Sequence, residues 1–144
     1  MFLKCQQKVK IAGIGHFLPT EIVTNEQLIL ESALPVSSSW IEQRMGVKQR
    51  HRVAPDMATS DMAIAAAQSA LKQSSINTQD IEAIILSTIS PDHPNPATAC
   101  AVQMGLGLSE TQCPCFDLSA ACSGFIYALD VGTRSILTGA QKVL

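Results

Sequence analysis

The chain alternates short apolar runs with longer segments of helical periodicity. Residues 9–15 form an apolar run ended by glycines, and residues 81–90 form a second, longer one. Both patterns predict buried strands. Residues 116–118 predict another short strand, and residues 141–144 predict the beginning of one more. Strands that alternate in this way with helices are typical of an α/β layered fold.

Helix start and stop signals stand between these runs. Thr24, followed three residues later by Gln27, has the spacing of a capping box and predicts a short helix through about residue 30. Residues 37–39 predict the cap of a second helix, and Gly46 predicts its end. Two further helices are expected, one over residues 97–106 and one from Gly124 through about residue 137.

The clearest helical pattern begins at Ser60 and Asp61. One face of this helix is made of small or slender residues, which lets a neighbouring element approach its backbone closely. These residues are Met62, Ala63, Ala66, Ala67, Ala70 and Leu71.

Composition narrows the function classes. The 144 residues amount to about one domain, 47% of them are apolar, and Lys plus Arg number 10 against 12 Asp plus Glu. A basic nucleic-acid binder and an extended disordered chain are therefore excluded. Residues 1–8 lack a signal-peptide core, and no run approaches the roughly 20 apolar residues that span a bilayer. We expect a cytoplasmic protein that does not bind membranes.

The five cysteines form no C-x-x-C pair. Cys113-Pro114-Cys115 offers a metal site or a strained disulfide as an alternative, but no second pair of soft ligands stands at suitable spacing. We therefore predict reduced thiols and no metal.

Cys122 lies in a turn of small residues, 120–124, between the strand at 116–118 and a helix. The unpaired N–H groups of a helix start favour a thiolate and would lower the pKa of this thiol. A sharp strand-to-helix turn also presents its side chain to a substrate, as in a nucleophile elbow. The alternative is a buried structural cysteine, and local reasoning leaves both interpretations open.

Trp40 stands one helical turn before Arg44. This spacing places an indole and a guanidinium on one side of the helix, where they can sandwich a planar adenine. The alternative is a helix packed through Trp40 with Arg44 in solvent. Arg50 and Arg52 could attract phosphate, although a solvated basic loop is the simpler interpretation. A dinucleotide loop at Gly13-Ile14-Gly15 is rejected, because the third glycine is missing.

Four motifs follow one another in the order found in β-ketoacyl-acyl carrier protein synthase III, and the sequence resembles the N-terminal half of that family. The motifs are Gly15-His16-Phe17-Leu18-Pro19, Thr24-Asn25, residues 40–47 with Arg50-His51-Arg52, and residues 117–125. The resemblance implies the thiolase-like fold, of which residues 1–144 would form the N-terminal half of a five-layered α/β/α/β/α architecture. Because the chain stops inside an apolar run, we expect it to be an incomplete piece.

The resemblance implies that Cys122 takes an acyl group from acyl-CoA. The family then condenses this group with malonyl-acyl carrier protein, which starts a fatty-acid or polyketide chain. Trp40 and Arg44 match the residues that grip the adenine of coenzyme A. The backbone N–H of Cys122 would contribute to an oxyanion hole. Acyl-CoA is thus expected as a substrate, with no permanently bound cofactor, in a homodimer.

The family's catalytic His and Asn belong to its second half. His16, His51 and His93 do not stand in that context, so we expect the 144 residues alone to be unable to condense. Asn95 replaces an aromatic residue of several relatives and predicts a roomier or more polar primer pocket. Two alternatives stay open: a related thiolase-fold acyltransferase that acts on oxygen or nitrogen, and a non-catalytic partner subunit.

Overall fold

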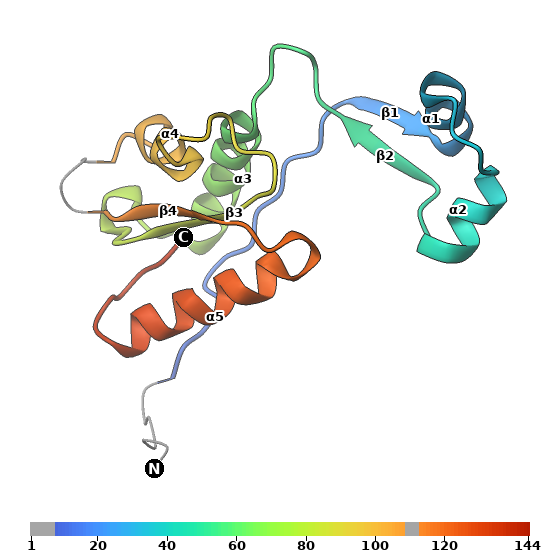
Figure 1. Cartoon of the computed structure of the whole chain (residues 1–144). Coiled ribbons are helices and arrows are strands. Elements are labelled where there is room, and N and C mark those ends of the chain that lie inside the picture. The colour runs from blue at the N-terminus through green and yellow to red at the C-terminus, as the bar shows by residue number, and fades with distance from the viewer. Residues whose placement is uncertain (1–7, 109–112) are drawn as a thin grey trace. The chain divides into compact units, whose positions relative to one another are not determined.

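The computed structural model describes residues 8–108 and 113–144 (Figure 1). The chain divides into two compact units. Unit 1 comprises Met1–Phe17 and Ala58–Leu144, and unit 2 comprises Leu18–Met57. The opening residues 1–7, with Cys5, lie outside the described part, and each unit is considered separately.

Unit 2 is an antiparallel pair of strands with two short helices between them in the chain. Strand β1 (Glu21–Thr24) pairs antiparallel with β2 (Gln49–Arg52), and the helices are α1 (Asn25–Ser32) and α2 (Ser38–Met45). The small core consists of three buried residues, Val23, Asn25 and Ile41.

The predicted helix signals of unit 2 are confirmed. The Thr24 hydroxyl accepts a hydrogen bond from the N–H of Gln27 at 3.2 Å, and the Gln27 side chain accepts one from the N–H of Thr24 at 3.3 Å. This reciprocal pair is the predicted capping box. Ser37 caps α2 through the N–H of Trp40, and Gly46 ends that helix in the left-handed region, with φ 70°.

Unit 1 is built on two parallel strands, β3 (Ile84–Ser87) and β4 (Cys115–Leu118), in which Ile84 is opposite Cys115 and Ser87 is opposite Leu118. Three helices accompany them: α3 (Thr59–Ser74), α4 (Thr98–Gly105) and α5 (Gly124–Leu137). Two single-turn 3₁₀ helices complete the unit, η1 (Thr78–Asp80) and η2 (Ala121–Ser123). The order of strands and helices bears out the predicted α/β class.

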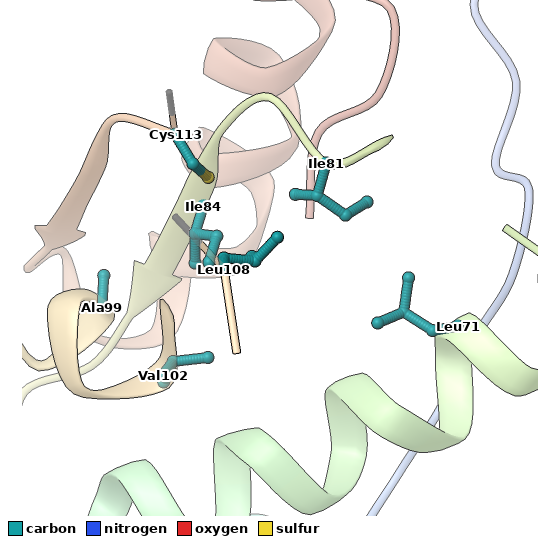
Figure 2. Close-up of a cluster of buried hydrophobic side chains, with 7 residues drawn as sticks. All are labelled: Leu71, Ile81, Ile84, Ala99, Val102, Leu108 and Cys113. Atoms are coloured by element: carbon teal, nitrogen blue, oxygen red, sulfur yellow. The ribbon is translucent and has the colours of Figure 1, made fainter. Parts of the chain in front are cut away.

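The core of unit 1 lies where β3 meets α3 and α4 (Figure 2). Ile84 of β3 is 2% exposed, and Ala99 and Val102 of α4 are 0% and 2% exposed. The full cluster is Leu71, Ile81, Ile84, Ala99, Val102, Leu108 and Cys113. Burial of these side chains holds β3 against α4.

The strand predicted at residues 9–15 is wrong. These residues form no ladder with any described strand and lie along α3 instead. A side chain at Gly13 would meet the carbonyl oxygen of Ala70 at 2.5 Å, and one at Gly15 would collide with that of Ala66. The predicted small-residue face of α3 is thus confirmed as a surface of close approach. The segment has the sequence of a strand, but a strand also needs a partner edge.

Two other strand predictions need correction. The run at 81–90 forms only four residues of strand, and residues 88–90 leave it as a loop. Residues 141–144 make one isolated parallel bridge, from Val143 to Ala83. The antiparallel pair of β1 and β2 is not predicted from the sequence, because its strands lack an apolar run; Gln49–Arg52 is wholly polar.

Candidate active site

Cys122 lies in η2, between the end of β4 and the start of α5. Its side chain is exposed, so the alternative of a buried structural cysteine is wrong. The preceding residue, Ala121, has φ 46°, in the left-handed region that a residue with a Cβ rarely adopts. The chain therefore makes a strained strand-to-helix turn at this point, the geometry that a nucleophile elbow requires.

A hollow of about 420 Å³ opens beside Cys122. One wall is the turn itself, and the other is the end of β3 with the loop after it. The lining residues are Ser87, Thr88, Ile89, Ser90, Ala121 and Cys122. Small and hydroxyl-bearing side chains predominate, which leaves room for a thioester carbonyl next to the thiol.

Backbone and side-chain bonds hold the loop wall of the hollow. The N–H of Thr88 donates to the carbonyl of Leu118 at 3.2 Å, which continues the β3–β4 pairing by one residue. The Thr88 hydroxyl accepts from the N–H of Ser90 at 3.0 Å, and the Ser90 carbonyl accepts from the Thr59 hydroxyl at 2.7 Å. The loop is therefore anchored to both β4 and α3.

Gly124 and Ser87 make a close contact that sequence reasoning missed. Gly124 is buried at the first position of α5, and a side chain there would collide with the Ser87 hydroxyl oxygen. The backbone φ of Gly124 is −56°, so the requirement for glycine is steric. No sequence signal identifies Ser87, because the contact depends on how β3 and α5 pack.

Cys113 and Cys115 have different surroundings from Cys122. Cys113 is 6% exposed, and burial raises the pKa of its thiol. Burial also raises the pKa of Cys115 to about 12, with a further contribution from the neighbouring Cys113 thiol. The Cys115 thiol donates to the Cys113 carbonyl at 3.0 Å. The four cysteines of the described residues are free thiols, and the same residues contain no group of three or more side chains that could hold a metal ion.

Trp40 and Arg44 lie one turn apart on α2, and both side chains are exposed. Trp40 is 48% exposed, whereas its neighbour Ile41 is 6% exposed. The helix thus packs mainly through Ile41, and about half of the Trp40 side chain is accessible to a ligand. Within residues 8–108 and 113–144, Arg44 makes no ion pair.

Arg50 and Arg52 are committed to structural contacts within unit 2. Arg50 donates to the carbonyl of Val23 at 3.2 Å and to the side-chain oxygen of Asn25 at 2.5 Å. Arg52 pairs with Glu31 at 2.5 Å and Glu21 at 3.3 Å, and the hydrogen bond to Glu31 raises the pKa of the Arg52 guanidinium. The predicted basic loop is in fact a strand, and these contacts give no support to phosphate binding.

The other candidate side chains are not among the residues that line the hollow. His16, His51 and His93 are exposed, and His51 contacts the carbonyl of Pro19 at 2.5 Å through Nδ1. Asn95 is also exposed and is not one of the lining residues. Its effect on primer choice stays a prediction.

The part of the chain that forms this turn matches a family model. Residues 116–144, which cover β4 from Phe116 onward, η2 and α5, match the family described as 3-oxoacyl-[acyl-carrier-protein] synthase III. A β-ketoacyl-[acyl-carrier-protein] synthase III of Solibacter usitatus is 45% identical over 135 residues, which are 94% of this chain and 40% of the relative. The chain is a homologue of β-ketoacyl-[acyl-carrier-protein] synthase III. It spans about 40% of the length of the curated synthases it matches.

Solved structures agree with this homology. The synthase III of Aquifex aeolicus VF5 aligns with a TM-score of 0.79 and 40% identity, over 91% of this chain and 41% of that one. The priming β-ketosynthase of the R1128 polyketide pathway aligns with a TM-score of 0.80 and 28% identity, over 92% of this chain and 38% of that one. The mixed α/β fold therefore matches the N-terminal part of a synthase III. No helix among the described residues is long and apolar enough to cross a membrane.

Proposed function

We propose that the chain forms the N-terminal part of a β-ketoacyl-acyl carrier protein synthase III and that Cys122 is its acyl acceptor. The observation that carries this proposal is the place of Cys122, exposed at a strained turn beside a hollow, within the segment that matches the family model. The other described cysteines are buried or partly buried.

The proposed step is transfer of an acyl group between two thiols. The Cys122 thiolate attacks the thioester carbonyl of acyl-CoA, and a carbon–sulfur bond forms to Cys122 Sγ. The bond to the coenzyme A sulfur then breaks, and the departing thiolate takes up the proton that Cys122 released. The partial positive charge at the start of a helix such as α5 stabilises the negative charge that develops on the thioester oxygen. Covalent capture divides a difficult condensation into two easier reactions.

Trp40 and Arg44 are the proposed contacts for the adenine of coenzyme A. Their support is exposure on one side of α2, together with the absence of an ion pair for Arg44 in the described part of the chain. An indole and a guanidinium so placed can both stack on a planar base. This proposed adenine contact does not depend on the role of Cys122.

The complete reaction of the proposed enzyme is condensation of the acyl group with malonyl-acyl carrier protein, in a cytoplasmic homodimer. None of the three histidines lines the hollow beside Cys122. With the 144 residues alone, we therefore expect the reaction to stop at the acyl-enzyme, before condensation. The likeness to a priming ketosynthase supports primer loading as the shared step. The likeness does not distinguish fatty-acid from polyketide synthesis as the use of the product. The choice of primer is the measurement that bears on it.

The test is intact-mass measurement of the purified chain after incubation with acetyl-CoA and with longer and branched acyl-CoAs. We expect a gain of one acyl group that disappears in Cys122→Ser and persists in Cys100→Ser. The acyl-CoA that reacts fastest identifies the primer. A folded chain that gains no mass with any acyl-CoA would contradict the acyl-acceptor role and favour a non-catalytic partner subunit.

A further inference from the structure

Asp117 links β4 to the start of α4. Its two carboxylate oxygens accept hydrogen bonds from the backbone N–H groups of Thr98, at 2.7 Å, and Ala99, at 2.8 Å. The N-cap residue of α4 is Ala97, which has no side chain able to cap. Asp117 therefore supplies, from a neighbouring strand, the acceptors that the first turn of α4 lacks.

Asp92 makes a similar link to α3. Its Oδ1 accepts a hydrogen bond from the N–H of Ser60 at 3.1 Å, and its own N–H donates to the Thr98 hydroxyl at 3.0 Å. Thr98 is 2% exposed and Asp92 is partly buried, so this junction is partly shielded from solvent. The loop at residues 88–97 is therefore held to α3 through Asp92, and its end is held to β4 through Asp117.

This loop forms one wall of the Cys122 hollow, through Thr88, Ile89 and Ser90. The opposite wall follows directly from β4, the strand that contains Asp117. The backbone of Asp117 thus belongs to the strand that leads to Cys122, while its side chain holds the helix that follows the loop. The two carboxylates therefore connect the elements that carry the two walls to α3 and α4.

We propose that Asp92 and Asp117 are positioning residues for Cys122, which set the width of the hollow and so the size of the group that reaches the thiol. The proposal rests on the acyl-acceptor role proposed for Cys122. An Asn at either position keeps the size of the side chain but loses the charge and replaces one acceptor with an NH₂ group. Hydrogen bonds to a charged acceptor are the stronger kind, so the loop is expected to loosen.

The test compares alkylation of Cys122 by iodoacetamide and by its bulkier N-benzyl analogue in Asp117→Asn. We expect the rate ratio of the small to the large reagent to fall about threefold, because a wider hollow discriminates less by size. Amide hydrogen exchange at Thr98 and Ala99 should rise about tenfold. Asp130→Asn is the matched control, since among the described residues Asp130 pairs with exposed Arg134 on its own helix, α5.

A merely structural role would raise exchange throughout unit 1 and leave the rate ratio unchanged. If Asp117→Asn does not fold, Asp92→Asn decides, because it loosens the same loop through a single side-chain bond. An unchanged rate ratio in the folded variant, equal to that of Asp130→Asn, would overturn the proposal. Failure of acyl-CoA to acylate the unaltered chain, with the ratio still shifted by Asp117→Asn, would contradict only the proposed function.

Discussion

The two ends of β4 place cysteines in opposite surroundings. At its start, Cys113 and Cys115 are packed into the core of unit 1, and burial raises the pKa of both thiols. Beyond its end, Cys122 is exposed in a turn with a left-handed residue before it. The same type of side chain is thus a small core residue at one end and an accessible thiol at the other. Packing and backbone geometry, not residue type, determine how accessible each thiol is.

The largest expected effect is a difference in thiol reactivity. With a pKa of about 12, only about one Cys115 side chain in ten thousand is a thiolate at pH 8. We therefore predict that limiting iodoacetamide at pH 8 labels Cys122 more than a thousandfold faster than Cys115, as counted by peptide mass spectrometry. In denaturant the two rates should become similar. Comparable labelling rates of Cys122 and Cys115 in the folded chain would contradict the difference in thiol reactivity.

The next effect is on alkaline stability. Because the native pKa of Cys115 lies above the ordinary value of 9.0, the native chain holds this proton more tightly than the unfolded chain. Its contribution is fully present below pH 9 and is lost as the pH rises toward 12. The free energy of unfolding should fall by up to about 1.4 kcal/mol per pH unit in this range through this one thiol.

Cys115→Ala should flatten this alkaline slope, while Cys122→Ser should retain it. Urea unfolding at several pH values between 9 and 11 measures both. A Cys115→Ala chain with the slope of the unaltered protein would show that the Cys115 thiol does not control alkaline stability.

Gly124→Ala is expected to have an effect of intermediate size. The new methyl group would collide with the Ser87 hydroxyl oxygen, which must rotate away from it, at a cost of about 0.5–1.5 kcal/mol. Adding Ser87→Ala should recover most of the loss, since the remaining Ser87 Cβ would lie at 3.4 Å. Thermal unfolding of the single and double variants measures this coupling.

Gly132→Ala is the matched control in the same helix. A side chain there would meet only Val143 at 3.5 Å and Ile85 at 3.7 Å, both ordinary contacts. It should raise stability by about 0.5–1 kcal/mol through helix propensity. Equal destabilisation by both substitutions would remove the special role of Gly124.

The smallest effect concerns unit 2. Trp40→Ala should weaken coenzyme A binding about fivefold, because the exposed stacking face of the indole is lost. Met45→Ala is the control, because Met45 is exposed on the same helix. Titration calorimetry with coenzyme A provides the affinities, and equal affinities of the two variants would argue against the adenine contact.

Local signals predicted the helices well, because caps and stops act over a few residues. The Thr24 and Gln27 capping box, the Ser37 cap and the Gly46 stop all lie where the sequence indicated. The turn at Cys122 was also expected, since small residues separate an apolar strand from a helix. These features depend on neighbours in the chain.

Strands were predicted less well, because their existence depends on distant partners. Residues 9–15 have the sequence of a strand but lie along α3, whereas polar Gln49–Arg52 forms a strand whose Arg50 bonds to Asn25. The contact of Ser87 with Gly124 and the links made by Asp117 were likewise beyond sequence reasoning. Each of them joins residues that only the packed fold brings together.

The most direct test of the acyl-acceptor role is to locate the acyl group after brief reaction of the unaltered chain with acetyl-CoA. Peptide mass spectrometry at a pH that preserves thioesters would compare all five cysteines in one sample. We predict the acetyl group on Cys122 and none on Cys113 or Cys115. An acetyl group on another cysteine, with Cys122 free, would contradict the acyl-acceptor role of Cys122.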